Sequence, residues 1–175
     1  LSLDEHDNHL RTFLKYLVAA VQTQFAEALP ETGTLLAASN LPSVPVLLRT
    51  LVNELQYIPQ RFILVLDDYH RITVPEIHEL LGELLRHPPQ TLHLVLITRT
   101  DPALELLYMR AHQQMGEVRT QALSFSVEET ADFLERLVGT AVEDGVVREI
   151  NKRTEGWVTG MRLLTLSVHD SVDLT

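Results

Sequence analysis

The uninterrupted apolar run Phe62–Leu66 constrains the fold most, because it ends directly in two acids, Asp67 and Asp68. Five apolar residues without alternation are typical of a strand buried on both faces of a parallel sheet. A second apolar run spans residues 92–97 and leads into Thr98-Arg99. Because a helical pattern lies between the two runs, the spacing predicts a strand–helix–strand unit and a parallel sheet.

Helical patterns surround this unit. Apolar residues at three-and-four spacing over residues 10–25 predict an amphipathic helix that Pro30 terminates. A second helix is expected over residues 46–55, with Ser43 as its cap. Residues 73–76 (Thr-Val-Pro-Glu) and 126–129 (Ser-Val-Glu-Glu) each have the pattern of a capping box, in which the first side chain caps the helix that follows.

The ends of the chain differ in character. Leu1-Ser2-Leu3 alternates like a strand already in progress, which suggests a piece of a longer protein. After a helix over residues 104–115 and a possible strand over 117–122, only helical patterns follow. The predicted fold class is therefore α/β, with a parallel-sheet layer over residues 1–124 and a small all-helical subdomain over residues 125–175.

Composition excludes several classes of function. The 175 residues carry a formal net charge of −10, so the chain as a whole lacks the basic footprint of a nucleic-acid-binding protein. The absence of cysteine excludes disulfides, thiolate metal sites and cysteine nucleophiles. Apolar runs too short for a bilayer and an N-terminus without a signal pattern predict a cytoplasmic protein with no membrane partner.

Asp67 and Asp68 are the first candidate site residues. In open α/β sheets ligands bind beyond the carboxyl ends of the strands. One carboxylate there can hold Mg²⁺, directly or through water, while its neighbour orients or deprotonates an attacking water. The alternative is structural, because aspartate is also common after strands as a turn and cap residue.

Arg99 is the second candidate, since it follows the next predicted strand and should lie at the same sheet edge as the two acids. Its planar, permanently charged guanidinium suits a terminal phosphate. An ion pair with one of those acids is the alternative reading. Gly156 and Trp157, at the start of the last helix, are the third candidate: free N–H donors there suit an anion or a ring, whereas a tight turn with a buried aromatic is the structural alternative.

Four segments together resemble one family. Residues 1–8 (LSLDEHDN), 64–70 (LVLDDYH), 94–102 (LVLITRTDP) and 153–157 (RTEGW) are similar, in order and spacing, to the nucleotide-binding domain of MalT-like, LuxR-type transcription regulators. These regulators belong to the STAND class of P-loop signalling ATPases, relatives of the NB-ARC proteins. The resemblance implies that ATP and an inducer switch self-assembly and transcription activation, with ATP, ADP and Mg²⁺ as cofactors.

Position by position, the resemblance implies that Asp67 supports Mg²⁺, that Asp68 polarises the hydrolytic water and that Arg99 senses the γ-phosphate. Gly156-Trp157 stands where the class has a turn that contacts adenine, but Val158 replaces the expected proline. Slow ATP hydrolysis would then reset the switch, and the helical subdomain would act as a lid.

The phosphate-binding loop of that class, Gly-x-x-x-x-Gly-Lys-[Ser/Thr], does not occur among these residues. This chain alone is therefore expected to bind nucleotide weakly, and the loop, the inducer sensor and the DNA-binding helix-turn-helix are expected elsewhere in a longer protein. A degenerate nucleotide-binding module that acts as a protein-interaction scaffold without hydrolysis remains the alternative. A receiver domain would need a lysine at the end of its last strand, and residues 117–123 contain none. The spacing of the histidines matches no helix-borne zinc motif.

Overall fold

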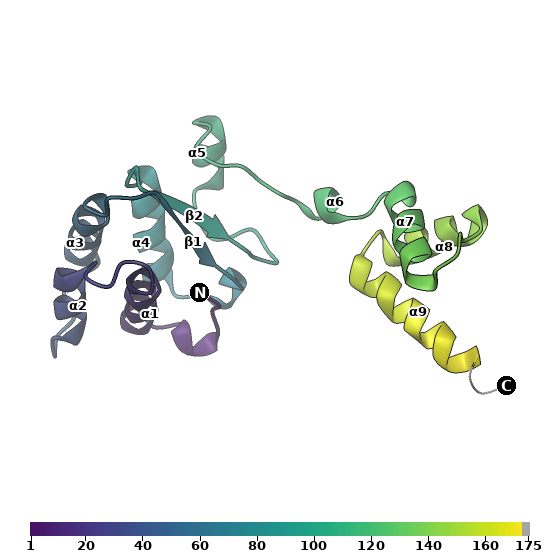
Figure 1. The fold of residues 1–175 in the computed structure, drawn as a ribbon. Coiled ribbons are helices and arrows are strands. Elements are labelled where there is room, and N and C mark those ends of the chain that lie inside the picture. Colours follow the sequence, from purple (N-terminus) through teal and green to yellow (C-terminus); the bar gives the residue numbers. More distant parts are fainter. Residues whose placement is uncertain (173–175) are drawn as a thin grey trace. The chain divides into compact units, whose positions relative to one another are not determined.

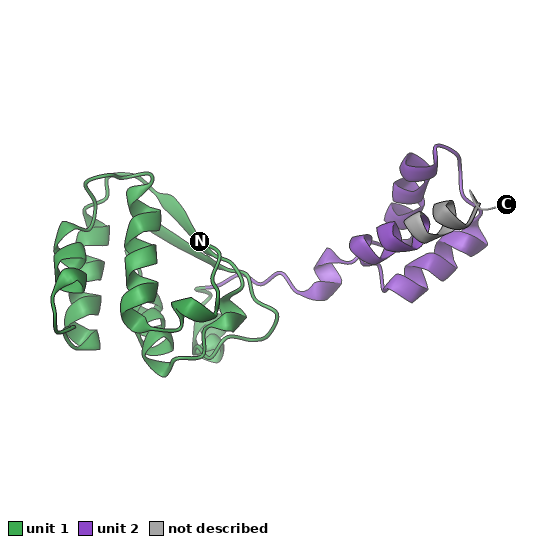
Figure 2. Cartoon of the chain, turned by 90° about the horizontal axis from the view of Figure 1, so that it is seen from below, with its two compact units in different colours: residues 1–114 green, residues 115–175 purple. Residues whose placement is uncertain are grey.

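The computed structural model describes residues 1–172, with side chains described as far as Thr165, and divides the chain into two compact units, residues 1–114 and 115–175 (Figure 2). The first unit is an α/β layer and the second is all-helical, so the predicted fold class is confirmed. The predicted boundary at residue 124, between a nucleotide-binding domain and a lid, remains a prediction about function.

The first unit contains a short parallel sheet (Figure 1). Strand β1 (Phe62–Leu66) pairs in parallel with β2 (Leu92–Leu96), with Leu64 opposite Leu94. Ser2 adds an isolated parallel bridge to Asp67, so the opening Leu1-Ser2-Leu3 pairs as the alternation predicted, over a shorter stretch.

Helices of the first unit follow the apolar periodicity, and their bounds are as follows: α1 (Leu10–Gln22), α2 (Pro30–Ala37), α3 (Val44–Gln56), α4 (Pro75–Arg86) and α5 (Leu106–Ala111), with single 3-10 turns η1 (Glu5–Asp7) and η2 (Tyr69–Arg71). The prediction that Pro30 ends the first helix was wrong. That helix ends at Gln22, and Pro30 instead begins α2, because a proline at the first helical position lacks only an N–H that would be unpaired anyway.

One face of the sheet is buried and the other is open. Leu64 and Leu66 of β1 belong to the core, together with Phe13 of α1, Leu51 of α3 and other helical residues. On the opposite face Ile63 is 65% exposed. The prediction of a strand buried on both faces was therefore wrong, because the described helices that pack on the sheet do so against one face only.

The two predicted capping boxes had different outcomes. In α7 (Val127–Val138) the Ser126 hydroxyl accepts from the Glu129 amide and the Glu129 carboxylate accepts from the Ser126 amide, so this box is confirmed. At α4 the box is absent, because the N-cap of this helix is Val74, one residue after Thr73. The Thr73 hydroxyl accepts a hydrogen bond from the Asn8 side-chain amide at 2.8 Å. Asn8 Oδ1 accepts instead from the amides of Thr73 and Val74, at 2.9 and 3.0 Å.

The second unit packs α7, α8 (Asp144–Thr154) and α9 (Val158–Val172) around Leu134, Val147 and Met161, all buried. The predicted strand over residues 117–122 was wrong: α6 (Thr120–Leu123) occupies this region. A strand needs a neighbouring strand for its backbone hydrogen bonds, whereas a helical turn satisfies its own. None of the described strands pairs with these residues.

Candidate functional site at the carboxyl end of the sheet

Asp67 is fixed by backbone hydrogen bonds at the end of β1. Its amide donates to the Leu1 carbonyl at 2.9 Å, and its carbonyl accepts from the Leu3 amide at 3.0 Å. On the other side, the Ile97 amide donates to the Leu66 carbonyl and the Tyr69 amide donates to the Ile97 carbonyl, at 2.9 and 3.0 Å. The segment that carries both acids is therefore held between two neighbouring chain segments, as a site that must keep its geometry requires.

Asp68 has a left-handed backbone, with φ 57° and ψ 33°. This conformation costs a residue other than glycine roughly 1–2 kcal/mol, although aspartate tolerates it better than most. The Asp67 Oδ1 atom accepts from the Asp68 amide at 2.9 Å and so supports the turn. Among the described residues no group donates a hydrogen bond to the Asp68 carboxylate; the His70 ring lies near it, with Nδ1 3.8 Å from Asp68 Oδ1. Backbone strain of this kind concentrates at functional sites.

Arg99 follows β2 in an exposed loop, where the Thr98 hydroxyl donates to the Thr100 carbonyl at 2.8 Å. Because Leu66 and Leu96 are partners in the parallel register, Arg99 lies at the same edge of the sheet as the two acids. The alternative reading, an ion pair with Asp67 or Asp68, is not formed by the described residues. The guanidinium therefore remains available to an anion at this edge.

The acids suit a partly protein-bound magnesium ion. Mg²⁺ usually takes one or two carboxylates and completes its octahedron with water and substrate phosphates. Asp67 and Asp68 supply two carboxylates. Across the described side chains, no group of three or more histidine, aspartate or glutamate residues gathers to hold a metal. Two carboxylates are the number that a Mg²⁺ ion with water and phosphate as its other ligands commonly uses.

A groove of about 850 Å³ lies beside this edge, between α4 and the loop over residues 100–105. Its walls include His70, His78 and Thr100, whereas neither acid nor Arg99 lines it. The candidate residues therefore sit on the open end of the sheet. Any phosphate bound there needs further donors from residues beyond these.

Gly156 and Trp157 lie in the second unit. Gly156 has φ +73°, and a Cβ atom there would lie 2.5 Å from the Phe125 carbonyl oxygen. The tight turn of the structural reading is thus present, but its buried aromatic is wrong, because Trp157 is 65% exposed. Nucleotide contact by this pair remains a prediction.

The chain matches curated proteins over most of its length, while no protein-family model matches it. It is 34% identical over 166 residues to the HTH-type transcriptional regulator MalT of Yersinia pestis (strain Pestoides F). It is 35% identical over 170 residues to the regulator of that name from Serratia proteamaculans (strain 568). These alignments cover 95% and 97% of the chain. The chain is homologous to the MalT regulators.

This homology confirms the resemblance found in the four sequence segments. The chain spans only 18% and 19% of the length of these two MalT regulators. Among the residues that the structure describes, no helix combines the length and apolar character needed to cross a membrane.

Sequence reasoning missed a partly buried polar pair, one member of which directly follows the two acids. The hydroxyl of Tyr69 lies 2.7 Å from Nδ1 of His78 on α4, and their rings meet edge to face. Burial raises the pKa of the Tyr69 phenol well above its ordinary value, so the hydroxyl stays protonated. The sequence signal that could have indicated this pair was Tyr69, an aromatic residue directly after the two acids. The pair ties η2, and with it the acidic turn, to α4.

The Tyr69–His78 pair should make folding sensitive to pH. Burial lowers the pKa of His78, and a hydrogen bond with the Ile72 backbone opposes this shift in part. The unfolded chain therefore takes up a proton on His78 more readily than the folded chain. The pair's contribution to stability is complete above the unfolded pKa of about 6.5 and decreases as pH falls below it.

Urea unfolding between pH 7.5 and 5 checks this expectation. In a Tyr69→Phe/His78→Leu double variant, in which neither member of the pair leaves the other unpaired, the fall in midpoint below about pH 6.5 should be shallower than in the unaltered chain. The exposed His87 provides the control, since His87→Gln should leave the slope unchanged. A double variant with the original slope would show that His78 does not set it.

Proposed function

We propose that this chain is the part of an ATP-dependent transcription regulator of the MalT type that carries the Mg²⁺-binding and water-activating acids and the γ-phosphate sensor. The observation that supports the proposal best is the placement of Asp67, Asp68 and Arg99 at one edge of a parallel sheet. Homology to proteins named as HTH-type transcriptional regulators supports the regulatory role.

Each residue has a distinct task in this proposal. Asp67, fixed on both sides by backbone hydrogen bonds, supports Mg²⁺, which when bound neutralises phosphate charge. Asp68, whose carboxylate is half exposed, accepts a proton from or orients the attacking water. Arg99 binds the terminal phosphate and so distinguishes ATP from ADP. Gly156 and Trp157 contribute to nucleotide binding from the helical unit.

The proposed regulator works as a two-state switch. ATP and an inducer favour a state that self-associates and activates transcription, and slow hydrolysis returns it to the resting state. In this proposal the phosphate-binding loop, the inducer sensor for a small molecule or protein and the DNA-binding helix-turn-helix lie in other parts of the longer, cytoplasmic protein. The net charge of −10 agrees with DNA contact outside this chain.

The decisive variant is Asp68→Asn in the longer protein that includes the phosphate-binding loop. The amide keeps the size of the side chain but cannot accept the proton, so ATP turnover should fall roughly 100-fold or more while ATP binding persists. Asp132→Asn, an exposed change on α7, is the matched control and should leave turnover unaltered. Measured phosphate release and nucleotide affinity separate the two effects.

Undiminished turnover in Asp68→Asn would reject the assignment of Asp68. If the unaltered longer protein binds its partners but neither binds ATP nor releases phosphate, the scaffold alternative is correct.

A further inference from the structure

His70 carries an unsatisfied polar atom directly beside the two acids. Its Nδ1 is the one fully buried side-chain nitrogen or oxygen, among the described residues, that lacks a hydrogen-bond partner. Leaving such an atom unpaired costs roughly 1–3 kcal/mol, so native structures rarely contain one without a reason. The neighbouring His78 provides the contrast, because its Nδ1 is paired with Tyr69.

The group that His70 faces is the Asp68 carboxylate. The distance from His70 Nδ1 to Asp68 Oδ1 is 3.8 Å, and the two side chains are 16% and 46% exposed. A bare nitrogen lone pair aimed at an anionic oxygen would be repelled, whereas an N–H at the same position is attracted. An Nδ1–H therefore suits this position, whereas a bare Nδ1 lone pair does not.

The backbone keeps this pair together. Asp68 and His70 flank Tyr69, whose amide is bound to the Ile97 carbonyl, and the Arg71 amide donates to the Asp68 carbonyl at 2.9 Å. The two side chains thus project from one short turn whose ends are fixed. No described group donates a hydrogen bond to the Asp68 carboxylate, and the unpaired Nδ1 of His70, 3.8 Å from Asp68 Oδ1, lies near enough for a small side-chain rotation to bring the two together.

We propose that His70 is a positioning residue that orients the Asp68 carboxylate through an Nδ1–H directed at Asp68 Oδ1. This inference rests on the proposed function, in which Asp68 acts on water. A carboxylate held by one donor keeps its other oxygen in a defined direction, and such supporting contacts commonly change activity 10–100-fold. The structural part of the inference, the proton on Nδ1, can be measured without any nucleotide.

The first test uses the 175-residue chain itself. Two-bond ¹H–¹⁵N NMR of the histidine rings reports which nitrogen carries the proton, and His70 should show Nδ1–H. Asp68→Asn should shift the ring signals of His70 and leave those of His78 unchanged, while Asp132→Asn should shift neither. A His70 ring protonated only on Nε2, or one insensitive to Asp68→Asn, would overturn the proposal.

The second test uses the longer, ATP-hydrolysing protein. Asparagine can place an N–H donor near the position of Nδ1, whereas leucine cannot. His70→Leu should therefore lower kcat roughly 10–100-fold with little change in KM for ATP, and His70→Asn should restore most of the loss. Equal kcat values for His70→Leu and the unaltered protein would also overturn the proposed positioning role of His70.

The two arms separate the failure of this inference from that of the proposed function. If Asp68→Asn abolishes turnover but His70→Leu does not, Asp68 retains its role and the positioning role is rejected. If the unaltered protein shows no turnover, the proposed function fails, and the NMR measurement alone decides whether His70 directs its proton at Asp68. Circular dichroism of His70→Leu and His70→Asn identifies a variant that has failed to fold.

Discussion

Gly156→Ala should severely destabilise the helical unit, by roughly 2–5 kcal/mol. An L-residue in the left-handed region costs about 1–2 kcal/mol, and Gly156 has φ +73°. The added Cβ would also lie 2.5 Å from the Phe125 oxygen and 2.8 Å from the Phe125 nitrogen. Overpacking against backbone that cannot move adds about 1–3 kcal/mol.

The Phe125 backbone cannot move aside, because it is hydrogen-bonded from two directions. Its amide donates to the Gly156 carbonyl at 2.8 Å, and its carbonyl accepts from the Asn151 side-chain amide at 2.9 Å. The same Asn151 amide group donates to the buried Thr130 hydroxyl at 2.7 Å. A shift of Phe125 would therefore disturb the contact between α7 and α8.

Trp157 makes this prediction easy to measure, since it is the single tryptophan of the chain and adjoins the altered residue. Urea or thermal unfolding followed by its fluorescence reports on the helical unit. Gly139→Ala is the matched control: Gly139 has φ +80° but nothing within 4 Å of the added Cβ, so only the conformational cost of about 1–2 kcal/mol applies. Equal losses in the two variants would show that the close approach to Phe125 contributes nothing.

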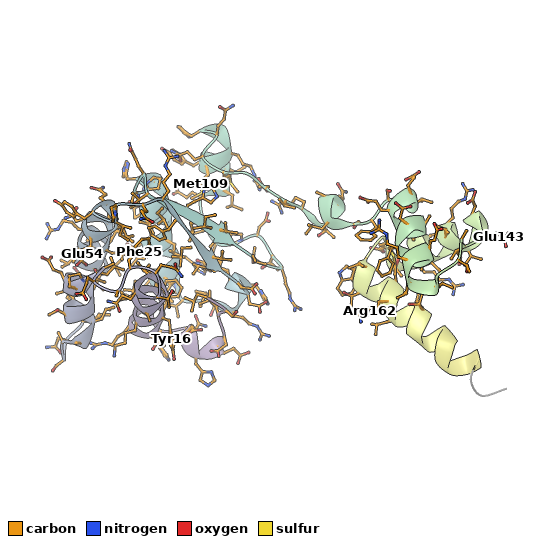
Figure 3. All side chains as sticks on the ribbon, in the orientation of Figure 1. Tyr16, Phe25, Glu54, Met109, Glu143 and Arg162 are labelled. Carbon is orange, nitrogen blue, oxygen red and sulfur yellow. The ribbon has the colours of Figure 1, made fainter. Side chains whose placement is uncertain are left out.

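Glu54→Ala should destabilise the α/β unit by about 2–4 kcal/mol, because Glu54 of α3 caps the first turn of α2. One carboxylate oxygen accepts from the Glu31 amide at 2.8 Å. The other accepts from the Thr32 amide at 2.9 Å and the Thr32 hydroxyl at 2.5 Å. Hydrogen bonds to charged groups are the stronger kind, and the negative charge also favours a helix N-terminus. The position of Glu54 in this unit is visible in Figure 3.

Circular dichroism during urea unfolding measures the loss, and amide exchange locates it: the Glu31 and Thr32 amides should exchange faster in Glu54→Ala. Glu54→Gln keeps one acceptor oxygen and removes the charge, so its urea midpoint should lie between those of the unaltered chain and Glu54→Ala. Glu27→Ala, an exposed change with the same effect on net charge, is the control. If it shifts the midpoint as much as Glu54→Ala does, net charge rather than capping explains the effect.

Patterns confined to a few neighbouring residues were predicted well. The apolar face of α1, the capping box at Ser126 and the strand Phe62–Leu66 all appear where the sequence indicates, because each depends on contacts within one element or on simple burial. The predicted capping box at Thr73 is absent, because the helix begins one residue later, with Val74 as its N-cap. The amides of Thr73 and Val74 instead donate to Asn8, a residue 65 positions before Thr73 that no local rule can locate.

The candidate site likewise contains features that the sequence predicts and features that only the structure shows. The placement of Asp67, Asp68 and Arg99 at one sheet edge was predicted from sequence, since residues directly after neighbouring parallel strands lie at the same edge, whereas their roles stay predictions. Their supports were not found: the Tyr69–His78 pair joins different elements, and the orphaned Nδ1 of His70 depends on burial. Periodicity does not encode either property.

By itself, then, the sequence determined the α/β class, the acidic strand end and the similarity to MalT-like regulators, because composition, spacing and short-range hydrogen bonds are written in adjacent residues. Only the tertiary structure decided that one face of the sheet is open, that Glu54 caps α2 and that Gly156 must lack a side chain. Each of these depends on atoms from segments 22 or more positions apart brought together in space. Such contacts follow from how whole elements pack, which no local pattern specifies.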